Sequence, residues 1–103
     1  MYLRIWEYEV PAGAVDRFVA AYGADGDWAR LFRRADGHVG TGLFRGAEDG
    51  GRFLTVDRWR DEPAWTAFLG TWEQEYRALD AALAPLTTAQ RLLLEGTPGG
   101  DVP

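Results

Sequence analysis

Residues 52–83 read RFLTVDRWRDEPAWTAFLGTWEQEYRALDAAL, and this stretch joins a predicted strand directly to the longest predicted helix of the chain. Its first eight residues are rich in β-branched and aromatic side chains, which favour a strand. Asp61 precedes Pro63 and predicts a helix start, because proline is tolerated in the first turn of a helix but not in its interior. Pro85 predicts the end of that helix for the same reason.

The residues before this stretch predict a strand and two shorter helices. Residues 2–10 (YLRIWEYEV) form the strand, which a Pro-Ala-Gly break ends. Apolar residues between 15 and 22 recur at helical spacing and predict an amphipathic helix that ends at Gly23. Asp27 is a predicted N-cap for the second helix, which ends near Asp36.

Two more strands complete the pattern. Residues 38–44 and 52–59 flank a polar, glycine-rich turn at 46–51 and predict a hairpin, while residues 89–95 predict a last strand. The order β-α-β-β-α-β predicts an α+β fold of the ferredoxin-like type, a four-stranded antiparallel sheet with its helices on one face.

The length of 103 residues is enough for one domain, which we expect to span residues 1–95. Residues 96–103 (GTPGGDVP) contain no side chain suited to a core, so we expect them to form a disordered tail.

The composition excludes several kinds of chemistry. The chain has no cysteine, serine, lysine or asparagine and a single histidine, His38. Thiol and serine nucleophiles, lysine Schiff bases and cysteine- or multi-histidine metal sites are therefore impossible, and we expect neither a metal nor a cofactor. A net charge of −5 argues against nucleic acid as a partner. No apolar run is long enough to span a membrane and no signal peptide is recognisable, so we expect a cytoplasmic protein.

Both faces of the predicted sheet carry apolar residues. In the first strand Leu3 and Ile5 point to one face while Trp6 and Tyr8 point to the other, although a sheet covered on one side should alternate apolar and polar residues. The helices can cover only one face. We therefore expect a homodimer in which two sheets pack face to face.

The chain also resembles a known family. The opening YLRIWEYEVPAG, the stretches YGADGDWARLF, GHVGTGLF and LTVDRW, and the segments WEQEYRALD and LTTAQ are similar to those of the dimeric α/β-barrel proteins of the antibiotic biosynthesis monooxygenase type. The resemblance implies a dimeric α/β barrel. Members include cofactor-independent oxygenases of phenolic polyketides, quinol oxygenases and haem-degrading enzymes, so the fold alone does not choose the reaction.

The resemblance assigns roles to individual residues. Trp59 and Trp65 match pocket-lining aromatic residues of the anthrone-oxidising members, whereas Thr55 stands where those members have a pocket asparagine. Haem degraders need a histidine and an asparagine where this chain has Ala78 and Glu7. The resemblance therefore argues against a haem-degrading enzyme, and the missing asparagine and histidine positions also favour a binding or accessory protein.

Strand alternation places Asp57 on the same face as Thr55 and Trp59. A carboxylate among such neighbours must be hydrogen-bonded, paired with arginine, or raised in pKa by desolvation, and the last case produces a usable base. The alternative is a bond that only orders the sheet. Glu7 in the first strand allows the same two interpretations.

Aromatic residues recur along one side of the long helix: Trp65, Phe68, Trp72 and Tyr76. They could wall a slot for a planar ligand, or they could be ordinary core. The Tyr76 hydroxyl needs a partner if buried and could donate to a ligand oxygen. His38 could shuttle protons, or it could be a solvent-exposed residue at the start of its strand.

The leading hypothesis is a cofactor-independent monooxygenase that acts on a phenolic or polycyclic aromatic small molecule. Asp57 or His38 would be the base, Trp59 and Trp65 the pocket walls, and Tyr76 a hydrogen-bond donor to a developing oxyanion. One alternative is a dimeric binding or accessory protein without catalysis. A second is an isomerase or cyclase that uses the same groups without oxygen.

Overall fold

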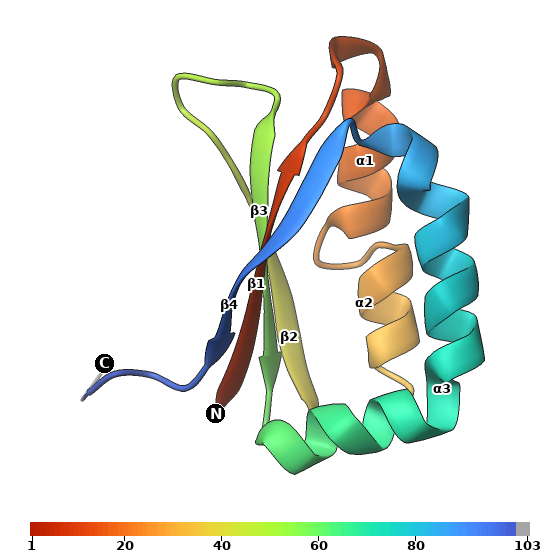
Figure 1. Ribbon diagram of the computed structural model, residues 1–103, viewed down its shortest axis with the longest axis vertical. Coiled ribbons are helices and arrows are strands. Elements are labelled where there is room, and N and C mark those ends of the chain that lie inside the picture. Colours follow the sequence, from red (N-terminus) through yellow and green to blue (C-terminus); the bar gives the residue numbers. More distant parts are fainter. Residues whose placement is uncertain (101–103) are drawn as a thin grey trace.

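The computed structural model describes residues 1–100 and consists of one antiparallel sheet with helices on one side (Figure 1). The strands follow the order β2-β3-β1-β4. Their bounds are β1 (Tyr2–Glu9), β2 (His38–Arg45), β3 (Arg52–Trp59) and β4 (Ala89–Gly96). The helices are α1 (Val15–Tyr22), α2 (Asp27–Phe32) and α3 (Glu62–Leu83), with short 3-10 turns η1 (Ala12–Ala14) and η2 (Ala84–Leu86). The predicted ferredoxin-like α+β fold is confirmed.

Local sequence features account for most of the helix and strand ends. Asp61 is the N-cap of α3, and its Oδ1 accepts a hydrogen bond from the Ala64 backbone N–H at 2.8 Å. Gly23 caps α1 as predicted. Asp27 differs from its prediction, since it is the first residue of α2 and Gly26 holds the N-cap position. Its carboxylate accepts instead from Arg30, one turn further along the helix, at 2.9 Å.

The last strand is one residue longer than predicted, because Gly96 still pairs with Leu3 of β1. Residues 97–100 form neither helix nor strand. The rest of the predicted tail, residues 101–103, lies outside the described residues.

A kink divides α3. Trp72 has non-helical backbone angles, φ −118° and ψ 29°, and Gly70 two residues earlier lowers the cost of leaving helical geometry. The part of α3 before the kink lies across one end of the sheet, and the part after it runs alongside the sheet (Figure 1). The two halves therefore present their side chains to different regions of the core.

The core lies between the sheet and the helices. Its four most deeply buried large side chains are Trp59, Phe18, Phe53 and Phe68. Along β3 every second residue, from Phe53 to Trp59, is buried against the helices. The opposite side of the sheet, called the open face below, has no helix over it (Figure 1). Within residues 1–100, no helix combines the length and apolar character that a membrane span requires.

Candidate active site

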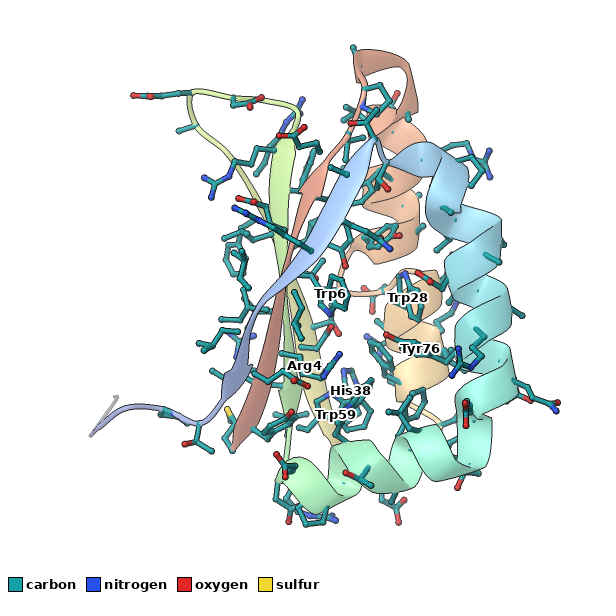
Figure 2. All side chains as sticks on the ribbon, viewed as in Figure 1. Arg4, Trp6, Trp28, His38, Trp59 and Tyr76 are labelled. Atoms are coloured by element: carbon teal, nitrogen blue, oxygen red, sulfur yellow. The ribbon has the colours of Figure 1, made fainter. Side chains whose placement is uncertain are left out.

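A cavity of about 70 Å³ lies between the helix-facing side of the sheet and the helices. Its aromatic walls are Trp6, Tyr8, Tyr22, Trp28, Phe32 and Tyr76, and its polar lining is Thr41, Thr55, Asp57, Asp80 and Gln90. Trp6, Trp28 and Tyr76 extend toward one another from the sheet, α2 and α3 (Figure 2). All four strands and the three α-helices thus contribute to one aromatic enclosure that contains two carboxylates.

Asp57 is the most unusual of the lining residues. It lies in β3, is 8% exposed, and accepts a hydrogen bond at Oδ1 from the Thr41 hydroxyl at 2.8 Å. Burial raises the pKa of Asp57 to about 6, although the Thr41 hydrogen bond and the charges of Arg4 and Arg58 act in the opposite direction. A carboxylate that titrates near neutrality inside a cavity is suited to remove and return protons.

His38 stands at the start of β2, next to Thr41. Its Nε2 lies 3.1 Å from the Thr41 hydroxyl oxygen, and its ring packs edge-on against Trp59 with centroids 5.2 Å apart. Figure 2 shows His38 and Trp59 close together at the lower end of the sheet. Burial lowers the pKa of His38, and the charge of Arg33 acts in the same direction. His38 is therefore neutral at pH 7, and it meets the cavity through two lining residues, by its hydrogen bond with Thr41 and by packing against the Phe32 ring.

Two tyrosines and a threonine add further hydroxyl groups to the cavity lining. Thr55 donates its hydroxyl hydrogen to the Tyr8 oxygen at 3.3 Å. Tyr76 reaches the cavity from the part of α3 beyond the kink. Burial raises the pKa of Tyr76, so its hydroxyl keeps its proton at neutral pH and can donate it to a ligand oxygen.

The indole N–H of Trp28 is buried and makes no well-formed hydrogen bond, although it lies near the Tyr22 hydroxyl, whose pKa is raised by burial while the indole acts to lower it. Trp28 is 8% exposed and lines the cavity. A buried donor without a partner costs free energy that a bound oxygen atom would recover. Trp28 therefore holds an unused donor close to the cavity, in addition to the Tyr76 hydroxyl.

The other predicted wall residues lie outside the cavity lining. Trp59 and Phe68 are 0% and 1% exposed and belong to the core, and Trp72 stacks on Phe68 with ring centroids 5.8 Å apart. Trp65 lies under the Arg4 guanidinium, 4.1 Å from its ring centroid. The kink explains the difference from the predicted slot, because it sends the half of α3 that carries Trp65 and Phe68 across the end of the sheet.

Glu7 also lies away from the cavity. It alternates with the cavity residues Trp6 and Tyr8 and therefore points to the open face. Its two carboxylate oxygens accept hydrogen bonds from Arg52 at 2.5 Å and Arg91 at 2.9 Å. The bond from Arg52, helped by Arg91, lowers the pKa of Glu7.

Sequence reasoning missed Arg4, which is 8% exposed and faces the helices from β1. It pairs with Glu95 of β4 and, together with Trp65 and Tyr76, lines a second cleft. Arg4 stands opposite Asp57 in the β1–β3 register. The signal that picked out Asp57, a charge among aromatic residues on one face of a strand, would have found it.

Sequence reasoning also missed Thr41. The hairpin register pairs it with Asp57, so its position could have been deduced from the turn between β2 and β3. Across residues 1–100, no group of three or more His, Cys, Asp or Glu side chains is arranged to hold a metal ion.

Comparison with known proteins points to one family. Residues 1–82 match the family model described as antibiotic biosynthesis monooxygenase. No curated protein sequence matches the chain. A monooxygenase encoded by the ActVA-Orf6 gene of Streptomyces coelicolor, solved with the ligand nanaomycin D, is similar with a TM-score of 0.78 and 17% identity, over 98% of this chain and 89% of that one. SnoaB, a cofactor-independent oxygenase from Streptomyces nogalater, is similar with a TM-score of 0.75 and 17% identity, over 99% and 96% of the two chains. At these identities the solved structures establish the fold.

Proposed function

The chain belongs to the antibiotic biosynthesis monooxygenase family, and from this premise we propose that it is a cofactor-independent monooxygenase of phenolic or polycyclic aromatic small molecules. The single observation that carries the proposal is Asp57, a buried carboxylate of near-neutral pKa on the wall of an aromatic cavity. The ligand nanaomycin D bound to the Streptomyces coelicolor relative supports a small-molecule substrate.

The proposed chemistry needs only a base, a dry cavity and dioxygen. Asp57 removes a proton from an acidic C–H of the electron-rich substrate, and the resulting carbanion transfers electrons to O₂ to form a peroxide. Loss of the second hydrogen from that carbon, with departure of water, converts the CH₂ group to a carbonyl, so that one oxygen atom enters the product and the other leaves as water. Trp28 and Tyr76 donate hydrogen bonds to the phenolate oxygen on which negative charge develops.

The aromatic residues divide into those that would touch the substrate and those that support them. Trp6, Trp28 and Phe32 line the cavity and would stack on a planar ring. Trp59, which the resemblance implies as a wall, instead packs behind His38 and Phe32. In the proposal, Trp59, Trp65, Phe68 and Trp72 act as scaffold.

The size of the cavity favours a second candidate function. Its volume of about 70 Å³ is about half that of an engineered protein cavity of about 150 Å³ that binds benzene. A fused-ring substrate therefore requires lining side chains such as Trp6 and Tyr76, both half-buried, to move aside. If they do not move, the chain is a non-catalytic binding or accessory protein.

Ligand titration tests the proposal. A panel of anthrones, phenols and quinols is added while tryptophan fluorescence is followed, with Trp28→Phe as the variant in the cavity and Trp59→Phe as the matched control in the core. We expect saturable quenching that falls in Trp28→Phe more than in Trp59→Phe, and oxygen uptake with the best ligand that is lost in Asp57→Asn.

The other outcomes choose among the alternatives. Saturable binding without turnover would leave the accessory function, and turnover that continues without oxygen would leave an isomerase or cyclase. Absence of saturable binding across the panel would overturn the proposed substrate class.

We propose in addition that the chain forms a homodimer through the open face. That face carries apolar residues from every strand: Leu3, Ile5, Leu54, Val56, Phe44 and Leu94. Phe44 and Leu94 are 51% and 53% exposed in the single chain. A second copy would remove this surface from water.

Sedimentation of the wild type and of Val56→Glu tests the dimer. Val56 lies at the centre of the open face, between β2 and β1. We expect a dimer for the wild type and a monomer for the variant, with Glu75→Ala on the exposed side of α3 as a control that stays dimeric. A wild-type monomer at micromolar concentration would overturn this part of the proposal.

A further inference from the structure

Three side chains of β2 and β3 form a continuous chain of hydrogen bonds: Asp57, Thr41 and His38. We propose that they act as one proton-transfer chain, in which Asp57 exchanges a proton with the ligand while Thr41 and His38 are positioning residues that connect this carboxylate to solvent. The inference rests on the proposed function for the identity of the reaction, but the chain itself can be tested without a substrate.

A β-bulge brings His38 into the chain. His38 and Thr41 are three residues apart, and in a regular strand an odd separation would put them on opposite faces of the sheet. The register between β2 and β3 shifts between His38 and Gly40. The extra residue, Val39, is 56% exposed, and its insertion lets His38 and Thr41 face the helices together. Bulges that redirect a side chain in this way recur beside active sites.

Thr41 is the only link between the two ends of the chain. Its hydroxyl oxygen lies 2.8 Å from Asp57 Oδ1 and 3.1 Å from His38 Nε2. A hydroxyl donates one hydrogen bond while it accepts another, so Thr41 can relay a proton in either direction. Thr41 and Asp57 line the cavity, whereas His38 does not. The chain therefore leads from inside the cavity to its outside.

The charged and titratable surroundings differ at the two ends. Asp57 faces Arg4 and Tyr8 on β1 and Tyr76 on α3, with Arg58 next to it on its own strand. Arg4 is already paired with Glu95. At the other end, His38 packs against the apolar rings of Phe32 and Trp59, and Arg33 is the charge that acts on it. The charge of Arg33 and the apolar rings both disfavour a protonated imidazole at His38. His38 therefore passes a proton on rather than keeping it.

The two tautomers of neutral His38 define the two directions. With its proton on Nε2, His38 donates to Thr41 and Thr41 donates to Asp57, which keeps the carboxylate ionised. With the proton on Nδ1, protonated Asp57 donates to Thr41 and Thr41 donates to Nε2. Transfer along this second arrangement leaves Asp57 ionised and both ring nitrogens protonated, and release of the Nδ1 proton to water restores the first arrangement.

The experiment uses the fact that His38 is the only histidine of the chain, so its ring nitrogens give unambiguous ¹⁵N signals. Wild type, Thr41→Val, Thr41→Ser and Asp57→Asn are titrated between pH 4 and 9. Thr55→Val is the matched control, because it removes a hydroxyl from the same cavity that bonds to Tyr8 instead.

In the wild type we expect a slowly exchanging Nε2 proton at high pH and a ¹⁵N titration with two steps, the second reporting Asp57. Thr41→Val and Asp57→Asn should lose the second step, and Thr41→Val should also lose the slow proton. Thr41→Ser and Thr55→Val should keep both.

A two-step titration that survives in Thr41→Val would overturn the proposed proton-transfer chain. If Thr41→Val fails to fold, as judged by near-ultraviolet circular dichroism, the comparison of Asp57→Asn with Thr41→Ser decides in its place, since only the former should lose the second step. With a substrate in hand, Thr41→Val should lower kcat about tenfold or more with little change in KM, and Thr41→Ser should restore it. If the hydrogen-bonded chain from Asp57 to His38 is intact but no substrate is turned over, the proposed function is contradicted and the proton-transfer chain is not.

Discussion

Each face of the sheet contains one central carboxylate, and the two respond to their surroundings in opposite directions. Asp57 of β3 faces the helices, where burial raises its pKa to about 6. Glu7 of β1 faces the open side, where the hydrogen bond from Arg52, with help from Arg91, lowers its pKa. Asp57 faces the aromatic cavity, while Glu7 lies between two arginines. The difference teaches that the partners available to a carboxylate, rather than its place in a central strand, decide whether it becomes a base or a structural ion.

The neighbouring strands supply those partners. Arg52 of β3 and Arg91 of β4 flank Glu7 from both sides. Within residues 1–100, the only arginine close to Asp57 on its own side of the sheet is Arg4, which is already paired with Glu95. Asp57 therefore keeps a single hydroxyl donor and carries a charge that costs stability. Such a cost is expected of a site arranged for chemistry rather than for stability, and chemistry is the role proposed for Asp57.

The largest effect is expected from removing the core residue beside Asp57. Trp59 is 0% exposed and contacts Phe32, His38, Trp65 and Phe68. Trp59→Ala should lower the free energy of unfolding by about 3–5 kcal/mol because it leaves a large cavity. Its neighbour Arg58 points to the open face, so Arg58→Ala should cost less than about 1 kcal/mol. Urea unfolding measures both, and equal losses would contradict the contrast between the faces.

The sequence predicts those parts of this contrast that depend on residues close together in the chain. Strand and helix ends follow from local features, such as the Asp61 N-cap and Gly23, and β3 has its predicted bounds. Alternation in β3 placed Asp57, Thr55 and Trp59 on one face. Each of these signals lies within a few residues of the element it describes.

The parts that sequence reasoning missed depend on distortions or on pairing between strands. Gly40 beside the bulge at Val39 and Gly70 near the kink at Trp72 permit these distortions, but a glycine alone does not show that a distortion occurs. Together the bulge and the kink determine that His38 joins Thr41 and that Tyr76, rather than Trp65, reaches the cavity. Alternation alone does not fix which face of β1 carries Glu7, so the sequence leaves it open as a base or as a residue that only orders the sheet, and the structure places it on the open face.

The second effect in size concerns Asp57 and pH. The folded-state pKa of Asp57 of about 6 lies above the ordinary value of 3.8. The contribution of protonated Asp57 to the free energy of unfolding is therefore fully present below about pH 3.8 and is lost as the pH rises through about 6. At pH 7.5 the ionised group should cost about 3 kcal/mol relative to a neutral one. Asp57→Asn should therefore be more stable than the wild type at pH 7.5 and similar to it at pH 4.

Urea midpoints of the wild type and Asp57→Asn at both pH values measure this effect. Asn keeps the volume of the side chain and an acceptor for Thr41. A variant that is less stable than the wild type at pH 7.5 would mean that the carboxylate holds the fold together, and the functional interpretation of its burial would fail.

The third effect should have the opposite sign. The pKa of Glu7 is lowered from its ordinary value of 4.5, so its contribution is present above about pH 4.5 and is lost as the pH falls through the lower folded-state value. Glu7→Gln should lower the melting temperature at pH 7, and the difference from the wild type should shrink toward pH 3. Thermal unfolding at the two pH values tests this, and a difference that grows in acid would reverse the assignment of the two carboxylates.

The smallest effect comes from a third carboxylate, which lies on neither face of the sheet and supplies the reference for the other two. Glu73 pairs with Arg77 one turn away on α3 at 2.8 Å, and the two side chains are 56% and 75% exposed. Water screens both charges, so Glu73→Gln should lower the free energy of unfolding by only about 0.3–0.5 kcal/mol, and about 1 M salt should erase the difference. The same salt should leave the larger, opposite effect of Asp57→Asn nearly unchanged, because the buried carboxylate is shielded from ions. A loss in Glu73→Gln that persists in salt would show that an exposed helix can hold an ion pair as firmly as the sheet does, and geometry alone would then no longer separate the three environments.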